Sequence, residues 1–133
     1  MHAILNSFNR DVSKLFDNFF REYNLATPFV ELLVHIHEDE KLSQKELSER
    51  MNLAPSTITR FIHKLQKRGL VEKKMNGRMA YITLTEKGKN LVPDLISTYQ
   101  KAEETLHKKL GEKFVHTTGQ LLMHGSEQLK IKL

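Results

Sequence analysis

The stretch LSQKELSERMNLAPSTITRFIHKLQKRGLVEKKMNGR, residues 42–78, decides the fold of this 133-residue chain. Ser43 and Glu46 have the spacing of a capping box, in which each side chain accepts a hydrogen bond from the other residue's amide, so a helix is predicted to begin there. Pro55 has no amide proton and suits the first position of another helix. A turn of about four residues would join the two helices, which is the helix-turn-helix arrangement.

The helix that begins at Pro55 combines an apolar stripe with a polar face. Its apolar residues follow the i, i+3, i+4, i+7 spacing that buries one side of a helix. They are Ile58, Phe61, Ile62 and Leu65. The opposite side carries hydroxyl, imidazole and basic groups on Ser56, Thr57, Thr59, Arg60, His63, Lys64 and Lys67. A helix with its side chains is about 10–12 Å wide and the DNA major groove is about 12 Å wide, so this helix is predicted to lie in a groove.

After this helix the pattern of apolar residues becomes that of extended chain. Asn76 and Gly77 form a strong hairpin signal, because both tolerate the positive φ of a type I′ turn. A loop of these two residues would place Val71 opposite Ile82 near the base of the hairpin. Basic side chains would crowd its tip, namely Lys73, Lys74 and Arg78. The predicted fold class is therefore mainly α with a small β-hairpin wing, a winged helix-turn-helix.

Positive charge is concentrated in the same stretch. The chain has a net charge of +5, but residues 1–40 hold 3 basic and 7 acidic side chains, residues 41–78 hold 10 and 3, and residues 79–133 hold 8 and 6. The net positive charge thus comes from the predicted helix-turn-helix and hairpin, as expected of a surface that binds a polyanion. Double-stranded DNA is the predicted partner, and a solvated basic face without a partner is the alternative.

Composition limits the other possibilities. Because the chain has no cysteine, disulfides, thiolate metal sites and cysteine-based oxidation sensing are excluded. No apolar run reaches the ~20 residues of a membrane span, and the N-terminus lacks the features of a signal peptide. We therefore expect a soluble, cytoplasmic protein without a membrane partner, and a single domain over residues 1–133 because no linker divides the chain.

Further helices are predicted on both sides of residues 42–78. They cover about residues 3–23 and 28–38 before this stretch, and about residues 86–110 and 112–130 after it. Thr27 and Thr85 are the predicted N-caps of the second and third of these helices. Gly111 is predicted to separate the last two.

The helices at the two ends of the chain carry more apolar surface than a small winged helix can cover. The first has two apolar edges, and the last carries apolar residues as far as Ile131 and Leu133. A two-fold homodimer built from both chain ends is the simplest explanation. The dimerisation helices would then be about residues 1–24 and 89–133, and the DNA-binding lobe about residues 27–88.

This order of elements, and three groups of residues within it, resemble the MarR family of transcriptional regulators. The groups are Ser56-Thr57-x-Thr59-Arg60, Leu65-x-x-x-Gly69-Leu70-Val71 and Leu84-Thr85-x-x-Gly88. The resemblance implies a homodimeric repressor whose recognition helices enter successive major grooves of a pseudo-palindromic operator, with half-sites about 34–36 Å apart. It also implies a wing in the minor groove, where Asn76-Gly77-Arg78 stands in place of the family's Asp-x-Arg, and a cleft for a small-molecule effector.

Individual contacts with DNA follow from residue chemistry. Arg60 is expected to read a base edge, ideally with two hydrogen bonds to a guanine, beside Ser56 and Thr57 at the helix N-terminus. The remaining contacts are expected to reach phosphates. These come from Thr59, His63, Lys64 and Lys67, from Ser43 and Gln44 at the start of the preceding helix, and from the wing residues Lys73, Lys74 and Arg78.

Seven histidines raise the question of a metal site. His35 and His37 are two residues apart, which places them about 200° around a helix, so they cannot share a small ion. Glu103 and His107 share one helical face and could supply two ligands, but an exposed pair without a metal is the commoner outcome. No metal and no cofactor are therefore predicted.

The sequence also bears on two functions other than DNA-binding regulation. An enzyme is not expected, because the chain has no Gly-rich phosphate loop, no cysteine nucleophile and no arrangement that would activate a serine. The alternative is a winged helix used for protein contacts without specific DNA binding, which predicts no basic recognition face. A cluster of aromatic residues could line an effector cleft or simply pack in the core: Phe8, Phe16, Phe19, Phe20, Tyr23 and Phe29.

Overall fold

Six α-helices, a short 3-10 helix and one β-hairpin make up residues 1–130, the part of the chain that the computed structural model describes. In chain order they are α1 (His2–Phe20), the 3-10 helix η1 (Arg21–Tyr23), α2 (Thr27–Glu38), α3 (Gln44–Met51), α4 (Pro55–Lys67), β1 (Val71–Asn76), β2 (Met79–Leu84), α5 (Glu86–Leu110) and α6 (Glu112–Leu129). The predicted fold class, mainly helical with a hairpin wing, is confirmed. Ile131 and Leu133, predicted as an apolar chain end, lie outside the described residues.

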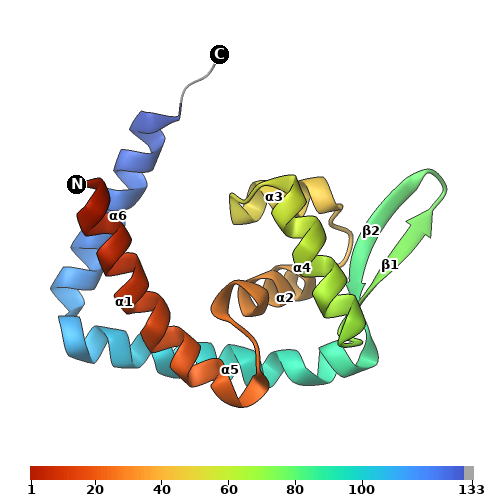
Figure 1. Cartoon of the computed structure of the whole chain (residues 1–133), viewed down its shortest axis with the longest axis horizontal. Coiled ribbons are helices and arrows are strands. Elements are labelled where there is room, and N and C mark those ends of the chain that lie inside the picture. The colour runs from red at the N-terminus through yellow and green to blue at the C-terminus, as the bar shows by residue number, and fades with distance from the viewer. Residues whose placement is uncertain (131–133) are drawn as a thin grey trace.

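The elements form two arms joined by α5 (Figure 1). One arm contains α2, α3, α4 and the hairpin, and the other contains α1 and α6. α1 and α6 meet where the rings of Phe8 and Phe114 pack with centroids 6.0 Å apart. Among residues 1–130, no helix combines the length and the apolarity that crossing a membrane requires.

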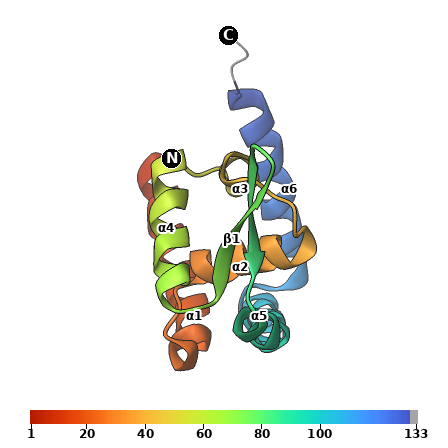
Figure 2. The ribbon, with the colours of Figure 1, turned by 90° about the vertical axis from the view of Figure 1, so that its right-hand side faces the viewer.

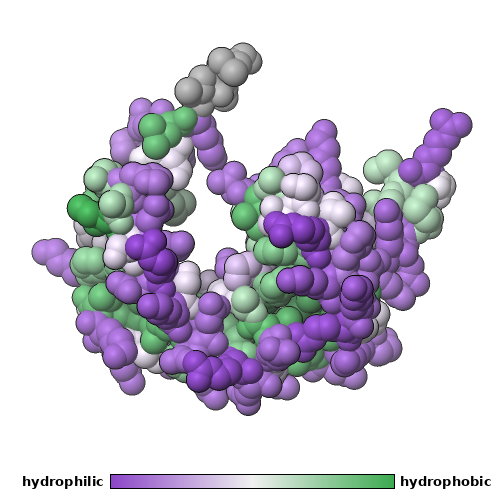
Figure 3. All heavy atoms as spheres, in the orientation of Figure 1, coloured by the Kyte–Doolittle hydropathy of each residue, from purple (hydrophilic) through white to green (hydrophobic). Residues whose placement is uncertain are grey.

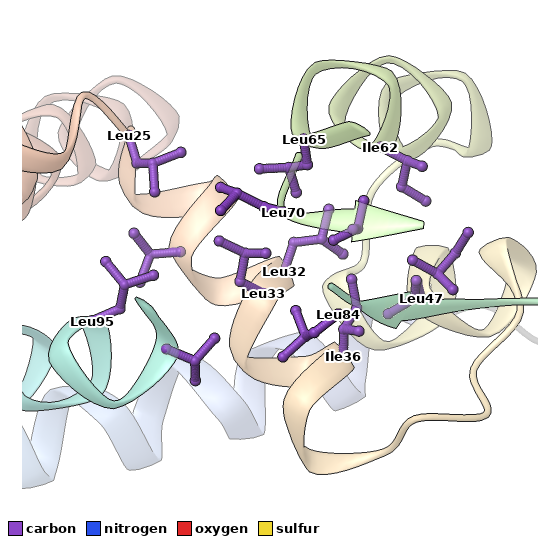
Figure 4. Close-up of a cluster of buried hydrophobic side chains, with 14 of the residues drawn as sticks. Leu25, Leu32, Leu33, Ile36, Leu47, Ile62, Leu65, Leu70, Leu84 and Leu95 are labelled. Atoms are coloured by element: carbon purple, nitrogen blue, oxygen red, sulfur yellow. The ribbon is translucent and has the colours of Figure 1, made fainter. Parts of the chain in front are cut away.

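α2 is the centre of the hydrophobic core. Its residues Leu32, Leu33 and Ile36 are fully buried. Figure 4 shows the side chains gathered around them, which include Leu47 of α3, Ile62 and Leu65 of α4, and Leu70, Leu84 and Leu95. Each fully buried leucine or isoleucine stabilises the fold by roughly 1.5–3 kcal/mol, so tertiary packing holds the helix-turn-helix in place.

The predicted helix ends around the turn are confirmed. The Ser43 hydroxyl accepts the Glu46 amide at 3.1 Å, and the Glu46 carboxylate accepts the Ser43 amide at 3.2 Å. Pro55 is the first residue of α4 and follows the N-cap Ala54. Gly69 follows α4 with a φ of 71°, the left-handed conformation in which glycine pays no steric cost.

The predicted N-cap of α2 is wrong. Ala26 occupies that position and Thr27 is the first residue of the helix. A carboxylate oxygen of Asp17, on α1, instead accepts hydrogen bonds from the Thr27 amide at 2.9 Å and from its hydroxyl at 2.7 Å. The cap therefore comes from another helix, whereas Thr85 caps α5 locally, as predicted, by accepting the Gly88 amide at 3.1 Å.

The hairpin forms with a register two residues away from the predicted one. Val71 pairs with Leu84 and Asn76 pairs with Met79, so the central turn residues are Gly77 and Arg78. Gly77 has a φ of 64°, and glycine at the first central position is typical of a type II′ turn. A shift of two residues keeps every side chain on its predicted face, which is why Val71, Ile82 and Leu84 are buried as expected.

Candidate nucleic-acid interface

One row of side chains on α4 faces away from the protein. This outer row consists of Ser56, Arg60, His63 and Lys67, which follow each other at helical spacing and are all exposed. Beneath it, Ile58, Ile62 and Leu65 are buried in the core. α4 forms one edge of the molecule in Figure 2, so a nucleic-acid groove can approach the outer row without displacing another element.

The neighbouring row of α4 is half-buried except for Lys64. This inner row consists of Thr57, Phe61, Lys64 and Arg68. The Phe61 ring stacks on Phe29 of α2 with centroids 4.4 Å apart, and the Lys64 ammonium lies 5.6 Å from the centroid of the same Phe29 ring. Lys64 is exposed and was predicted to meet a phosphate, and its ammonium lies beside the Phe29 ring.

Two threonines of α4 make local hydrogen bonds. The Thr59 hydroxyl donates to the Pro55 carbonyl at 3.0 Å, so the proton of this predicted phosphate contact is already used. A guanidinium nitrogen of Arg60 lies 3.5 Å from the Thr57 hydroxyl, at the outer limit of a hydrogen bond. Arg60 is exposed, and this long contact is weak, so its guanidinium can turn toward a ligand.

The start of α3 is the second part of the interface. Ser43 and Gln44 are both half-buried there. The Ser43 hydroxyl accepts the Glu46 amide, so it can offer a phosphate only its proton. The first amides of a helix have no partner within it and lie at the positive end of its dipole, so they attract anions as well.

The wing is the third part of the interface. Lys73, Lys74 and Arg78 are exposed, and Arg78 stands in the turn itself. Lys74 forms an ion pair with Glu72 at 3.2 Å, which reduces the positive field at the middle of the hairpin. The base of the wing is fixed, because the Ile82 amide donates to the Leu42 carbonyl at 2.9 Å.

The outer row of α4, the start of α3 and the wing all belong to the same arm (Figure 1). The structure also shows two polar side chains with roles that the sequence analysis missed. One is Asp17, which caps α2, and the other is Arg68, whose guanidinium binds backbone carbonyls at the end of η1. Each partner is distant in the sequence, so no local pattern could have identified them.

A cleft lies between α1, α2 and α5, near the junction of the two arms. It has a volume of about 490 Å³, and Phe16, Glu31 and Tyr99 are among its lining residues. A second cavity of about 320 Å³ shares Glu31 and Tyr99. Of the aromatic cluster predicted from the sequence, Phe16 lines the larger cavity, whereas Phe20 is fully buried and Phe29 stacks on Phe61.

Two ionisable groups in this cleft are perturbed. Burial raises the pKa of the Glu31 carboxyl, and the nearby His35 partly opposes that change. Burial, together with the charges of Glu31 and Glu103, raises the pKa of Tyr99 to about 12. The cleft therefore disfavours negative charge on its own side chains.

The predicted pair of Glu103 and His107 includes a third residue. The His107 Nε2 lies 3.6 Å from a Glu103 carboxylate oxygen, and its Nδ1 lies 2.9 Å from a carboxylate oxygen of Glu112. The two carboxylates face opposite nitrogens of the ring. Within residues 1–130, no three His, Asp or Glu side chains are placed to hold a metal ion.

The arm formed by α1 and α6 exposes apolar side chains. Ile4 is 69% exposed and Leu121 is 65% exposed. Single exposed apolar residues are common, but several of them together on one part of a surface often mark an interaction site. Others on this arm are Leu5, Phe114, Leu122, Met123 and Leu129. Figure 3 shows these elements with apolar atoms on their surface, beside the hollow between the arms.

Comparison with known sequences gives a family match within the candidate interface. Residues 28–76 match the model of the MarR family. The HTH-type transcriptional regulator SarZ of Staphylococcus epidermidis is 33% identical over 86 residues, which are 62% of this chain and 58% of that protein. SarZ of Staphylococcus aureus is 34% identical over 84 residues, 61% of this chain and 57% of that protein. The match thus spans less than two thirds of these relatives.

Comparison with solved structures extends the likeness to almost the whole chain. The S. aureus MepR–DNA complex matches with a TM-score of 0.84 and 17% identity, over 96% of both chains. A mutant of E. coli MarR complexed with operator DNA matches with a TM-score of 0.84 and 19% identity, over 97% of this chain and 93% of that one. Residues 28–76 are thus similar in sequence to the MarR family, and the fold of almost the whole chain is similar to that of solved MarR-type regulators.

Proposed function

We propose that the protein is a sequence-specific DNA-binding transcriptional regulator, a repressor that acts as a homodimer on a pseudo-palindromic operator. The observation that carries this proposal is the outer row of α4, an exposed polar and basic row directly above a buried apolar stripe. It lies in the part of the chain where residues 41–78 hold 10 basic and 3 acidic side chains. Charge and shape therefore coincide on a helix that fits a major groove.

Within the interface, each group of residues has its own role. Arg60 reads a base edge, with Ser56 and Thr57 beside it at the start of α4. His63 and Lys67 continue the exposed outer row along one strand of phosphates, while Thr59, Lys64, Ser43 and Gln44 contribute from its edges. The wing residues Lys73, Lys74 and Arg78 reach the flanking groove.

The chain divides into a DNA-binding lobe of about residues 27–88 and dimerisation helices of about residues 1–24 and 89–133. The exposed apolar side chains of α1 and α6 support this division, because a second copy would remove them from water. A two-fold dimer also matches the symmetry of a palindromic operator.

A small molecule that releases the protein from DNA would bind in the cleft between α1, α2 and α5. The cleft lies at the junction of the two arms, so a ligand there can change the angle between them. BpsR of Bordetella bronchiseptica, whose structure matches with a TM-score of 0.85 and 16% identity, is described as regulated in its DNA binding by 6-hydroxynicotinic acid.

Binding to promoter DNA around the protein's own gene tests the proposal. Affinity is measured against salt for that duplex and for a scrambled duplex of equal length. We expect tight binding to one duplex, with log K falling against log salt by about 0.9 for each neutralised phosphate. Equal and weak binding to both, and to duplexes selected from a random pool, would instead favour a winged helix used for protein contacts.

A further inference from the structure

Arg68 stands at the C-terminal end of the recognition helix, directly after the exposed Lys67. From the sequence it looks like one more basic residue for phosphate contacts. The structure uses it differently, because its guanidinium donates to the Asn24 carbonyl at 2.6 Å and to the Tyr23 carbonyl at 2.8 Å. Arg68 is half-buried, whereas Lys67 is exposed. The two neighbouring basic residues therefore point to different surroundings.

The carbonyls that Arg68 binds belong to the corner between α1 and α2. Asn24 ends η1 in the left-handed conformation, with a φ of 52°, and this turn leaves the last carbonyls of η1 without a helical partner. The Tyr23 hydroxyl lies 3.3 Å from the Thr98 hydroxyl of α5, so the corner is also attached to the long helix. Arg68 thus binds a fixed point on the dimerisation side of the molecule.

The main chain of Arg68 is held from the other side. Lys87, in the first turn of α5, donates to the Arg68 carbonyl at 3.0 Å. The end of the recognition helix is therefore tied both to the α1–α2 corner and to the start of α5. In the described residues, the two guanidinium bonds of Arg68 are the hydrogen bonds that join α4 directly to residues 1–24.

We infer that Arg68 is a positioning residue, which fixes the angle of the recognition helix relative to the dimerisation helices and so sets the half-site spacing that the dimer accepts. This inference rests on the proposed function. In a two-fold dimer, a tilt of each α4 changes the separation of the two helices, and half-sites match only when that separation is about 34–36 Å. Loss of the Arg68 bonds would let each lobe tilt, so binding would tolerate more spacings.

The test compares Arg68→Ala with Lys67→Ala on an operator that the wild-type protein selects from random duplexes. Affinity is measured for the selected spacing and for spacers one base pair longer and shorter, at several salt concentrations. For Arg68→Ala, which removes both guanidinium hydrogen bonds, we expect the preference for the selected spacing to fall by at least on the order of tenfold, with the salt slope unchanged. For Lys67→Ala we expect the opposite, a slope smaller by about 0.9 and an unchanged spacing preference.

Arg68→Lys separates charge from geometry. A lysine keeps the positive charge but lacks the planar fork that donates to two carbonyls, so we expect it to resemble Arg68→Ala in spacing preference. Amide hydrogen exchange of Asn24, which donates to the Arg21 carbonyl, and of Thr27, which donates to Asp17, gives a readout without DNA, and it should accelerate in both variants.

The possible failures are distinguishable. A smaller salt slope with intact spacing preference in Arg68→Ala, restored by Arg68→Lys, would make Arg68 a phosphate contact and overturn the inference. Unchanged spacing preference and unchanged exchange in both variants would also overturn it. If the wild-type protein selects no sequence at all, the proposed function fails first, and the inference fails with it.

Discussion

Gly88 lies in the first turn of α5 and is the position where adding a methyl group should harm the fold most clearly. A Cβ at Gly88 would overlap the carbonyl oxygen of Leu70 and come within 3.2 Å of the carbonyl carbon of the same residue. That carbonyl also accepts the Thr85 amide at 3.0 Å. The substitution Gly88→Ala therefore forces apart the start of α5 and the connection between α4 and β1.

The expected magnitude is a balance of opposing effects. Alanine in a helix interior is favoured over glycine by about 1 kcal/mol, which alone would stabilise the variant. Forcing a methyl group into a packed backbone costs about 1–3 kcal/mol, and the weakened hydrogen bond between Thr85 and Leu70 costs about 1 kcal/mol more. We therefore expect Gly88→Ala to lower the free energy of unfolding by about 1–3 kcal/mol.

Urea unfolding at one fixed protein concentration measures this change, because the stability of a dimer depends on concentration. Gly119→Ala in α6 is the matched control, since an added Cβ there meets nothing within 4 Å. We expect that control to be equal to the wild type or more stable by up to about 1 kcal/mol. If Gly88→Ala is as stable as Gly119→Ala, then α5 does not approach the Leu70 carbonyl as closely as described, and the reasoning is refuted.

Three further predictions concern the interface, the cleft and the chain ends. Arg60→Ala should weaken operator binding by about 1–3 kcal/mol and relax specificity at one position, and a uniform loss over all sequences in a competition assay would make Arg60 a phosphate contact. Glu31→Gln should raise the melting temperature near neutral pH, because burial raises the pKa of Glu31 and the folded wild-type protein therefore carries an unfavourable charge there. The gain in melting temperature should vanish as the pH falls toward the ordinary pKa of a glutamate. A difference in melting temperature that does not depend on pH would contradict this prediction. Leu121→Glu should shift the protein toward monomer in sedimentation experiments, because a charge would be buried in the proposed dimer interface, while Gln120→Glu should not. Equal behaviour of the two variants would show that Leu121 does not lie in the dimer interface.

The helix ends that depend on nearby residues could be predicted from the sequence. Ser43 with Glu46, Thr85 with Gly88, and Gly69 after α4 each involve groups within a few residues, so their spacing carries the information. The buried stripe of α4 could be predicted for the same reason. These features define the helix-turn-helix, so the fold class follows from local sequence alone.

Contacts between distant residues could not be predicted in this way. The cap of α2 comes from Asp17, ten residues away on another helix, and the partners of Arg68 lie 44 and 45 residues away. Nothing near Arg68 distinguishes it from Lys67, since both are basic residues at the end of one helix. Only the packing of α4 against the α1–α2 corner separates the exposed Lys67 from Arg68, which faces the protein.

The hairpin shows where such errors matter for function. At its base, burial of Val71, Ile82 and Leu84 requires the correct face, and a slip of one residue would expose them. A slip of two residues keeps that face, so the core gives no reason to prefer Asn76-Gly77 over Gly77-Arg78 as the turn. The backbone geometry of the exposed tip decides between these two turns, and among the tip residues Gly77 is the one with a positive φ. The position of Arg78 on the wing, and so its reach toward DNA, is therefore set by turn geometry rather than by the hydrophobic core.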